Sequence, residues 1–123
     1  MREIKFRAWF EKFKEMYTVK MIDLQKEIAY FDKYNYRSFY DTDLMEYTGL
    51  KDKNNKEIYE GDIVIHHSKM HKIIFNAEEA RFVLRDDEFE LEIPFTNNNS
   101  KRMEIVGNIY ENPELIKEWD NGI

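Results

Sequence analysis

Three histidines, His66, His67 and His71, stand close together and are the residues best suited to metal chemistry. On a helix, His67 and His71 would share one face and could chelate a divalent metal ion. They follow the apolar run 63–65, however, which is typical of a buried strand, where adjacent side chains point to opposite faces. His66 and His67 would then not both meet His71. The sequence favours a polar strand end and turn, and we expect no bound metal.

Five carboxylates fall within the seven residues 86–92, at Asp86, Asp87, Glu88, Glu90 and Glu92. Paired carboxylates can catalyse proton transfer when one of them is desolvated. Here they crowd into a predicted turn and into the alternating segment 89–93, which places its acids on the solvent face. The D-x-[DN]-x-[DN]-G pattern of a calcium loop is missing. We therefore expect a solvated, negatively charged face.

Nucleophilic and nucleotide-dependent catalysis have little support in the sequence. None of the three serines, Ser38, Ser68 and Ser100, lies in a G-x-S-x-G motif, and the chain has no cysteine. The four glycines are scattered, so neither a P-loop nor a dinucleotide-binding fingerprint is present. We expect a protein that is not an enzyme and that uses no cofactor.

Aromatic residues gather between Tyr30 and Tyr40, where six of eleven positions are aromatic. The candidate binding residues of this segment are Tyr30, Tyr34, Tyr36, Arg37 and Tyr40. Three interpretations remain open. The side chains can pack in a core or at a sheet edge, form a protein interface, where tyrosine is enriched, or stack on the bases of a single-stranded nucleic acid. Six Lys and Arg against three acids in the first twenty residues support the last interpretation.

The elements that would position these residues are mostly strands. Val, Ile, Thr, Tyr, Phe and Trp make up 40 of the 123 residues, against four alanines. We expect strands near residues 4–8, 16–19, 21–31 with a break at 25–26, 62–65, 72–75, 81–84, 89–93 and 103–106. Residues 34–40 are predicted to be irregular or an edge, and 97–100 a loop. Asn112-Pro113-Glu114 signals a helix that continues through Trp119. The prediction is one domain over residues 1–123, a small curled sheet or SH3-like barrel with a short C-terminal helix.

Charge and hydrophobicity limit the partners. The net charge is −6 and 36% of residues are charged, which disfavours a general nucleic-acid partner because phosphate binding depends on excess Lys and Arg. The longest unbroken apolar run is residues 28–31, too short for a transmembrane helix or a signal-peptide core. We expect a cytoplasmic protein with no membrane partner.

Three segments resemble the YopX family of phage and prophage proteins. They read IKFRAW at 4–9, LMEYTGLKDKNNKEIYEGDIV at 44–64 and EIVGNIYENPELI at 104–116, in the order found in the family. The stretch 68–102 matches only as a strand–turn–strand pattern. The resemblance implies a small β-rich fold related to SH3-type barrels in a phage accessory protein, acting in the bacterial host cytoplasm. It carries over no activity, cofactor or catalytic residue.

These observations favour a non-enzymatic module that binds a host or phage protein or assembles with itself. The alternative is a single-stranded nucleic-acid-binding protein that uses Tyr34, Tyr36, Arg37 and the basic N-terminal strand. A third and weaker hypothesis is a metal-dependent enzyme that uses the three histidines.

Overall fold

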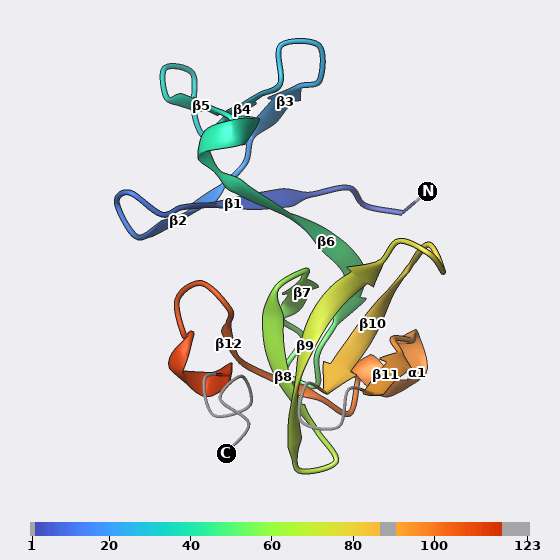
Figure 1. Cartoon of the computed structure of the whole chain (residues 1–123). Helices are drawn as coiled ribbons and strands as arrows, with labels where there is room; N and C mark the ends of the chain where they lie inside the picture. The colour runs from blue at the N-terminus through green and yellow to red at the C-terminus, as the bar shows by residue number, and fades with distance from the viewer. Residues whose placement is uncertain (1, 87–90, 117–123) are drawn as a thin grey trace. The chain divides into compact units, whose positions relative to one another are not determined.

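The structure, a computed structural model, describes residues 2–86 and 91–116 (Figure 1). It is mainly β, with a curled sheet and few short helices, which confirms the predicted fold class. The chain divides into two compact units, Met1–Tyr47 and Thr48–Ile123, and each is described by itself. The expectation of one domain over residues 1–123 stays a prediction.

The first unit begins with a hairpin of β1 (Phe6–Phe10) and β2 (Glu15–Thr18). β6 (Asp43–Lys51) pairs with the other edge of β1, so the strand order in this unit is β2-β1-β6. β1 is therefore an inner strand, and its Ala8 and Trp9 are buried. Among the described strands, β2 has a neighbour on one side only.

A second, three-stranded sheet completes the first unit. β3 (Met21–Asp23), β4 (Ile28–Tyr30) and β5 (Tyr36–Ser38) pair in the order β3-β4-β5, and a 3-10 helix, η1 (Phe39–Asp41), follows. The turn between β3 and β4 is closed by the Asp23 side chain, whose Oδ1 accepts hydrogen bonds from the backbone of Gln25 and Lys26. The predicted break at 25–26 and the predicted edge segment at 34–40 are both confirmed.

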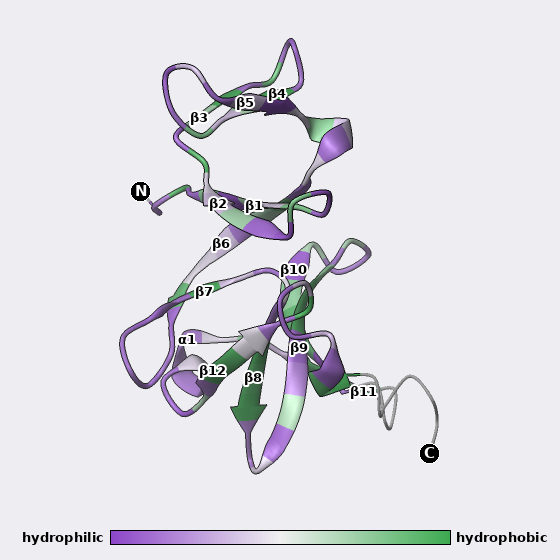
Figure 2. Ribbon diagram, turned by 90° about the vertical axis from the view of Figure 1, so that its left-hand side faces the viewer, coloured by the Kyte–Doolittle hydropathy of each residue, from purple (hydrophilic) through white to green (hydrophobic). Residues whose placement is uncertain are grey.

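The second unit holds the main hydrophobic core. The strands of this unit are β7 (Glu57–Tyr59), β8 (Asp62–His66), β9 (Lys69–Asn76), β10 (Arg81–Asp86), β11 (Leu91–Pro94) and β12 (Glu104–Asn108). Five of these strands form a sheet in the order β11-β10-β9-β8-β12, and Figure 2 shows β8 mostly in the green of hydrophobic residues. The core consists of Ile58, Val64, Ile73, Leu84 and Met103. Because these side chains come from five different segments, the core ties most of the unit together.

Residues 97–100, predicted to be a loop, instead form the short helix α1 (Asn97–Ser100). Thr96 Oγ1 accepts a hydrogen bond from the Asn99 amide, and Asn99 Oδ1 accepts one from the Thr96 amide, so the two side chains form a capping box. In the part of the chain that the structure describes, no helix is long and apolar enough to cross a membrane.

The predicted C-terminal helix is described only at its start. Residues 114–116 are helical, and the amides of Leu115 and Ile116 donate to the carbonyls of Asn112 and Pro113. The predicted continuation through Trp119 lies outside the described residues.

Candidate functional site

Three apolar side chains form a row across the three-stranded sheet of the first unit. Met21 pairs with Tyr30 in register, and Tyr30 pairs with Tyr36. Directly opposed residues on neighbouring strands point to the same face, so the three side chains lie side by side. The ring centroids of Tyr30 and Tyr36 are 5.5 Å apart, and Met21 and Tyr36 are 56% and 53% exposed. We call Met21, Tyr30 and Tyr36 the outer row.

A hollow of about 490 Å³ lies beside the outer row. Lys20, Met21, Tyr30, Asp32 and Lys33 line it. Asp32 accepts hydrogen bonds from the Asn35 side chain and from the backbone amides of Tyr34 and Asn35, which hold its pKa below the usual value. Its carboxylate is therefore already occupied within the turn, whereas the two lysines bring positive charge to an apolar wall.

Arg37 does not join the outer row. It pairs in register with Ala29, and Ala29 with Ile22, so these three side chains face the opposite side of the sheet. The Arg37 guanidinium carbon lies 4.7 Å from the centre of the Phe10 ring, and its Nη1 donates to the Tyr36 carbonyl. The structure thus separates Arg37 from the tyrosines with which the sequence grouped it.

Tyr34 and Tyr40 are the most exposed of the candidate residues, at 79% and 83%. Tyr34 lies in the turn between β4 and β5, with the Lys33 ammonium 5.5 Å from its ring centre. Tyr40 lies in η1, and its hydrogen bond to Glu27 raises the pKa of its hydroxyl. Their exposure rules out a core-packing role for these two side chains.

The sequence analysis missed Met21 and Lys20 as members of this surface. Both precede the aromatic segment in sequence and join it only through the pairing of β3 with β4. The signal that could have located Met21 was the predicted break at 25–26, because a hairpin centred there places Met21 opposite Tyr30.

The histidine cluster lies in the second unit. His66 and His71 are buried with ring centroids 6.1 Å apart, and burial is the main cause that lowers the pKa of each. His67 lies in the turn between β8 and β9, where it and Ser68 have positive φ angles of 52° and 64°. This confirms the predicted strand end and turn. Among the described residues, no three His, Asp or Glu side chains are placed to hold a metal ion.

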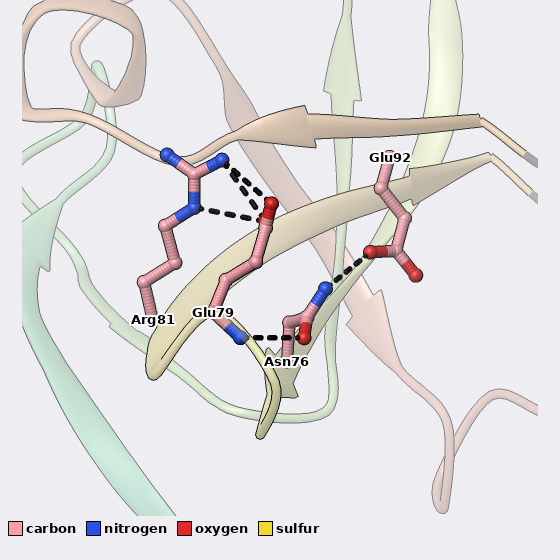
Figure 3. Close-up of polar contacts among 4 residues, drawn as sticks. All are labelled: Asn76, Glu79, Arg81 and Glu92. Atoms are coloured by element: carbon pink, nitrogen blue, oxygen red, sulfur yellow. Dashed lines mark hydrogen bonds and ion pairs between the residues drawn. The ribbon is translucent and has the colours of Figure 1, made fainter.

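Of the two described acids in 86–92, the expectation of a solvated acidic face is wrong for Asp86 and holds for Glu92, which is exposed. Asp86 is buried, 3.8 Å from the Lys69 ammonium. Glu92 forms an ion pair with Arg85, with 3.1 Å between the charged atoms. Glu92 also accepts a hydrogen bond of 2.8 Å from the Asn76 side chain, which Figure 3 shows. β-strand pairing brings bases and amides opposite these acids, which the sequence pattern did not reveal. Residues 87–90 lie outside the described residues.

The sequence was then compared with known proteins. The family model described as YopX protein matches residues 5–117. The chain belongs to the YopX family. Among solved structures, it is similar to the crystal structure of protein EF1440 from Enterococcus faecalis, with a TM-score of 0.75 and 29% sequence identity over 95% of this chain and 100% of the other. No curated protein matched. The resemblance drawn from the three sequence segments is confirmed.

One YopX segment, 44–64, contains a buried carboxylate that joins two parts of the second unit. Asp52 Oδ1 accepts hydrogen bonds from the amides of Asn54 and Lys56, and Oδ2 accepts one from Ile105 in β12. Burial opposes ionisation, but these backbone donors outweigh it and hold the pKa of Asp52 below its usual value. We therefore interpret Asp52 as a structural residue that fixes the 52–56 turn against β12.

The YopX segment 104–116 is also explained by local structure. Asn108 Oδ1 accepts hydrogen bonds from the amides of Tyr110 and Glu111. Asn112 Oδ1 accepts one from the Asn108 amide. A Cβ atom on Gly107 would lie only 2.5 Å from that oxygen, so the close approach requires glycine. These side chains build a turn, and they offer no reactive group.

Proposed function

We propose that this YopX-family protein is a non-enzymatic phage or prophage accessory module, and that its first unit binds another protein through the outer row. The observation that carries the proposal is the row itself. Met21 and Tyr36 expose apolar surface on a three-stranded sheet, and the Tyr30 ring lies between them in register. Tyrosine and methionine are enriched at protein interfaces, where both bury large apolar areas and the tyrosine hydroxyl can stay hydrogen-bonded.

The distribution of charge supports a protein partner. In the first unit, nine Lys and Arg balance nine Asp and Glu, so the whole net charge of −6 resides in residues 48–123. A neutral surface with exposed aromatic rings neither repels nor strongly attracts charged partners. Apolar contact therefore dominates the interaction that we propose.

The alternative, binding of single-stranded nucleic acid, is favoured by the two lysines of the hollow next to the Tyr30 ring. Arg37 does not contribute to it there, because its side chain faces the opposite side of the sheet. The balanced charge of the first unit also weakens this alternative, since counterion release needs an excess of cations.

The proposal is tested with the double variant Met21→Asp, Tyr36→Asp and the matched control Leu24→Asp. Leu24 is exposed in the β3–β4 turn of the same unit, so the control adds a charge nearby without changing the outer row. Each tagged chain is used for affinity capture from the cells that make it, and sedimentation measures self-association. Circular dichroism checks that each variant stays folded.

We expect the wild type and Leu24→Asp to retain the same partner, whether another protein or a second copy, and the double variant to lose it. Equal retention by all three chains would contradict the proposal. Submicromolar binding of labelled oligothymidine, lost in the double variant, would replace it with the nucleic-acid alternative.

A further inference from the structure

A second surface of the first unit has the features of a site for an extended peptide. It is a groove of about 460 Å³ that borders β2, and it is distinct from the outer row. Met16, Tyr17 and Thr18 of β2 line it together with residues of the segment 31–37. The groove thus runs beside a strand that has only one partner strand in the part of the chain that the structure describes.

The hydrogen-bonding pattern of β2 shows which backbone groups face away from β1. The amide of Val19 donates to the carbonyl of Phe6, and in an antiparallel ladder hydrogen-bonded pairs alternate with non-bonded pairs. The register then places Tyr17 and Glu15 in bonded pairs with Ala8 and Phe10. Met16 and Thr18 lie in the alternate pairs, so their amides and carbonyls point outward from the sheet.

The pairing of β1 with β6 supports this assignment independently. The Tyr47 amide donates to the Lys5 carbonyl, which places Arg7 and Trp9 in the bonded pairs with β6. Residues that bond to β6 cannot bond to β2 as well, so Thr18 and Met16, their register partners, have no ladder bonds to β1. Within the described chain, no other hydrogen bond engages the backbone of these two residues.

Side chains supply the walls and the charge of the groove. Tyr17 and Phe31 stand side by side with ring centroids 4.7 Å apart. Lys20 and Arg37 bring two positive charges, and in the described part of the chain no carboxylate lies within ion-pair distance of the Lys20 ammonium. Asp32 is the one acid among the lining residues, and its oxygens already accept three hydrogen bonds in its own turn. The lining therefore has a net positive charge.

We infer that the edge of β2 binds an extended segment of a partner protein by strand addition, and that this segment carries a carboxylate opposite Lys20. The outward amides and carbonyls of Met16 and Thr18 pair with the backbone of the added strand, which is the established way in which an open sheet edge recognises a peptide. The Tyr17 and Phe31 rings contact one of its apolar side chains, and Lys20 pairs with its acid.

The charge of the groove favours a foreign acidic peptide over a second copy of the chain. A second copy would present its own β2 with another Lys20 and Arg37, and its Glu15 is hydrogen-bonded to Tyr17. Two grooves of like net charge would then face each other, which disfavours that pairing.

The test pans a random dodecapeptide library displayed on yeast against the full-length chain, and measures selected peptides by fluorescence anisotropy. The key variant is Thr18→Pro, which removes an outward amide and is tolerated on an edge strand, and Thr18→Val is the matched control that keeps the amide. Circular dichroism monitors folding. Hydrogen exchange on the wild type measures the exchange rates of the Met16 and Thr18 amides with and without peptide. The test therefore does not depend on the folding of the proline variant.

We expect enriched peptides that contain Asp or Glu, and slower exchange of the Met16 and Thr18 amides when they bind. Thr18→Pro should weaken binding at least about tenfold, because an unsatisfied backbone hydrogen bond is expensive, whereas Thr18→Val should bind like the wild type. Replacing the peptide acid with its amide should weaken binding about two- to fivefold, and Lys20→Gln should abolish that difference.

The inference is overturned if no peptide is enriched, if Thr18→Pro binds as tightly as Thr18→Val, or if the two amides exchange equally fast with and without peptide. A dimer in sedimentation that Thr18→Pro abolishes would assign the edge to a second copy instead. Tighter binding of oligothymidine than of any selected peptide would assign the groove to nucleic acid. The outer-row variant Met21→Asp, Tyr36→Asp should keep peptide binding, so failure of the proposed function and failure of this inference are distinguishable.

Discussion

The two units of the chain use their apolar residues in opposite ways. Residues 48–123 bury a core of five aliphatic and methionine side chains beneath a five-stranded sheet. The first unit instead holds most of the large apolar residues that are exposed. Seven of the ten that are exposed in the described chain lie within it, namely Ile4, Phe13, Met21, Leu24, Tyr34, Tyr36 and Tyr40. The contrast places the main hydrophobic core in the second unit, and it supports our proposal that the first unit supplies the surface for recognition.

The net charge also differs between the two units. The first unit is neutral, whereas the second carries the entire net charge of −6. A strongly acidic surface favours solubility and repels nucleic acid and anionic membranes, and a neutral aromatic surface favours contact with another protein. The average composition of the chain hides this difference, and only the division into units reveals it.

The largest expected effect on stability comes from replacing one leucine by alanine in each unit. Leu84 is fully buried in the core of the second unit, so Leu84→Ala should lower the free energy of unfolding by about 2 to 5 kcal/mol. Leu24 is exposed in the first unit, so Leu24→Ala should change it by less than about 0.5 kcal/mol. Urea denaturation measures both. Similar decreases in the free energy of unfolding for the two variants would contradict this difference between the units.

A smaller effect is expected at Asp52. Asp52→Ala should destabilise the second unit by about 3 kcal/mol, because three backbone amides lose their acceptor. Glu104→Gln is a suitable control, since Glu104 is an exposed partner of Asn54 and Lys53. A loss at Glu104 as large as that at Asp52 would show that surface charge rather than the buried acceptor holds the 52–56 turn.

Mild acid should lower the stability of the second unit, because protonation of its buried histidines favours the unfolded chain. The pKa values of His66 and His71 are held below the usual 6.5 in the folded chain, chiefly by burial, so the unfolded chain binds protons more readily. Their contribution to stability is therefore complete above about pH 6.5, and it is lost as the pH falls from there toward the lower folded values.

The midpoint temperature of thermal unfolding should accordingly decrease when the pH is lowered from 7.5 to 5.5. Scanning calorimetry measures this decrease. His66→Phe should flatten the profile and cost little, since it also removes a buried Nδ1 that has no hydrogen-bond partner among the described residues. An unchanged slope in the variant would contradict the role assigned to His66. Protonation of Asp52 acts in a separate window, below its unfolded pKa of about 3.8, where its contribution is lost on further acidification.

Most strands were predictable because their causes are local. Alternation with period two located β1, a short apolar run located β8, and the predicted break at 25–26 located the β3–β4 turn. The Asp23 side chain closes that turn with bonds that span only three residues. Features of this kind need no knowledge of distant contacts.

The remaining features depend on pairing or on weak local signals. The outer row exists only because the register joins Met21 to a tyrosine on each of two later strands. Asp86 is buried and lies 3.8 Å from the ammonium of Lys69 in β9, although its sequence context resembles a solvated turn. The helix at 97–100 was missed because asparagine is a poor helix former and its capping box uses Asn99 where Glu or Gln is usual.

The comparison between the units is tested most directly by site-specific photo-crosslinking in the cells that make the chain. The photoreactive residue p-benzoylphenylalanine replaces Tyr36 in the first unit or Phe75 in the second, both exposed aromatic positions on strands. Our account predicts a covalent adduct with another protein, or with a second copy of the chain, from position 36 and none from position 75. An adduct from position 75 alone, or from neither position, would contradict it.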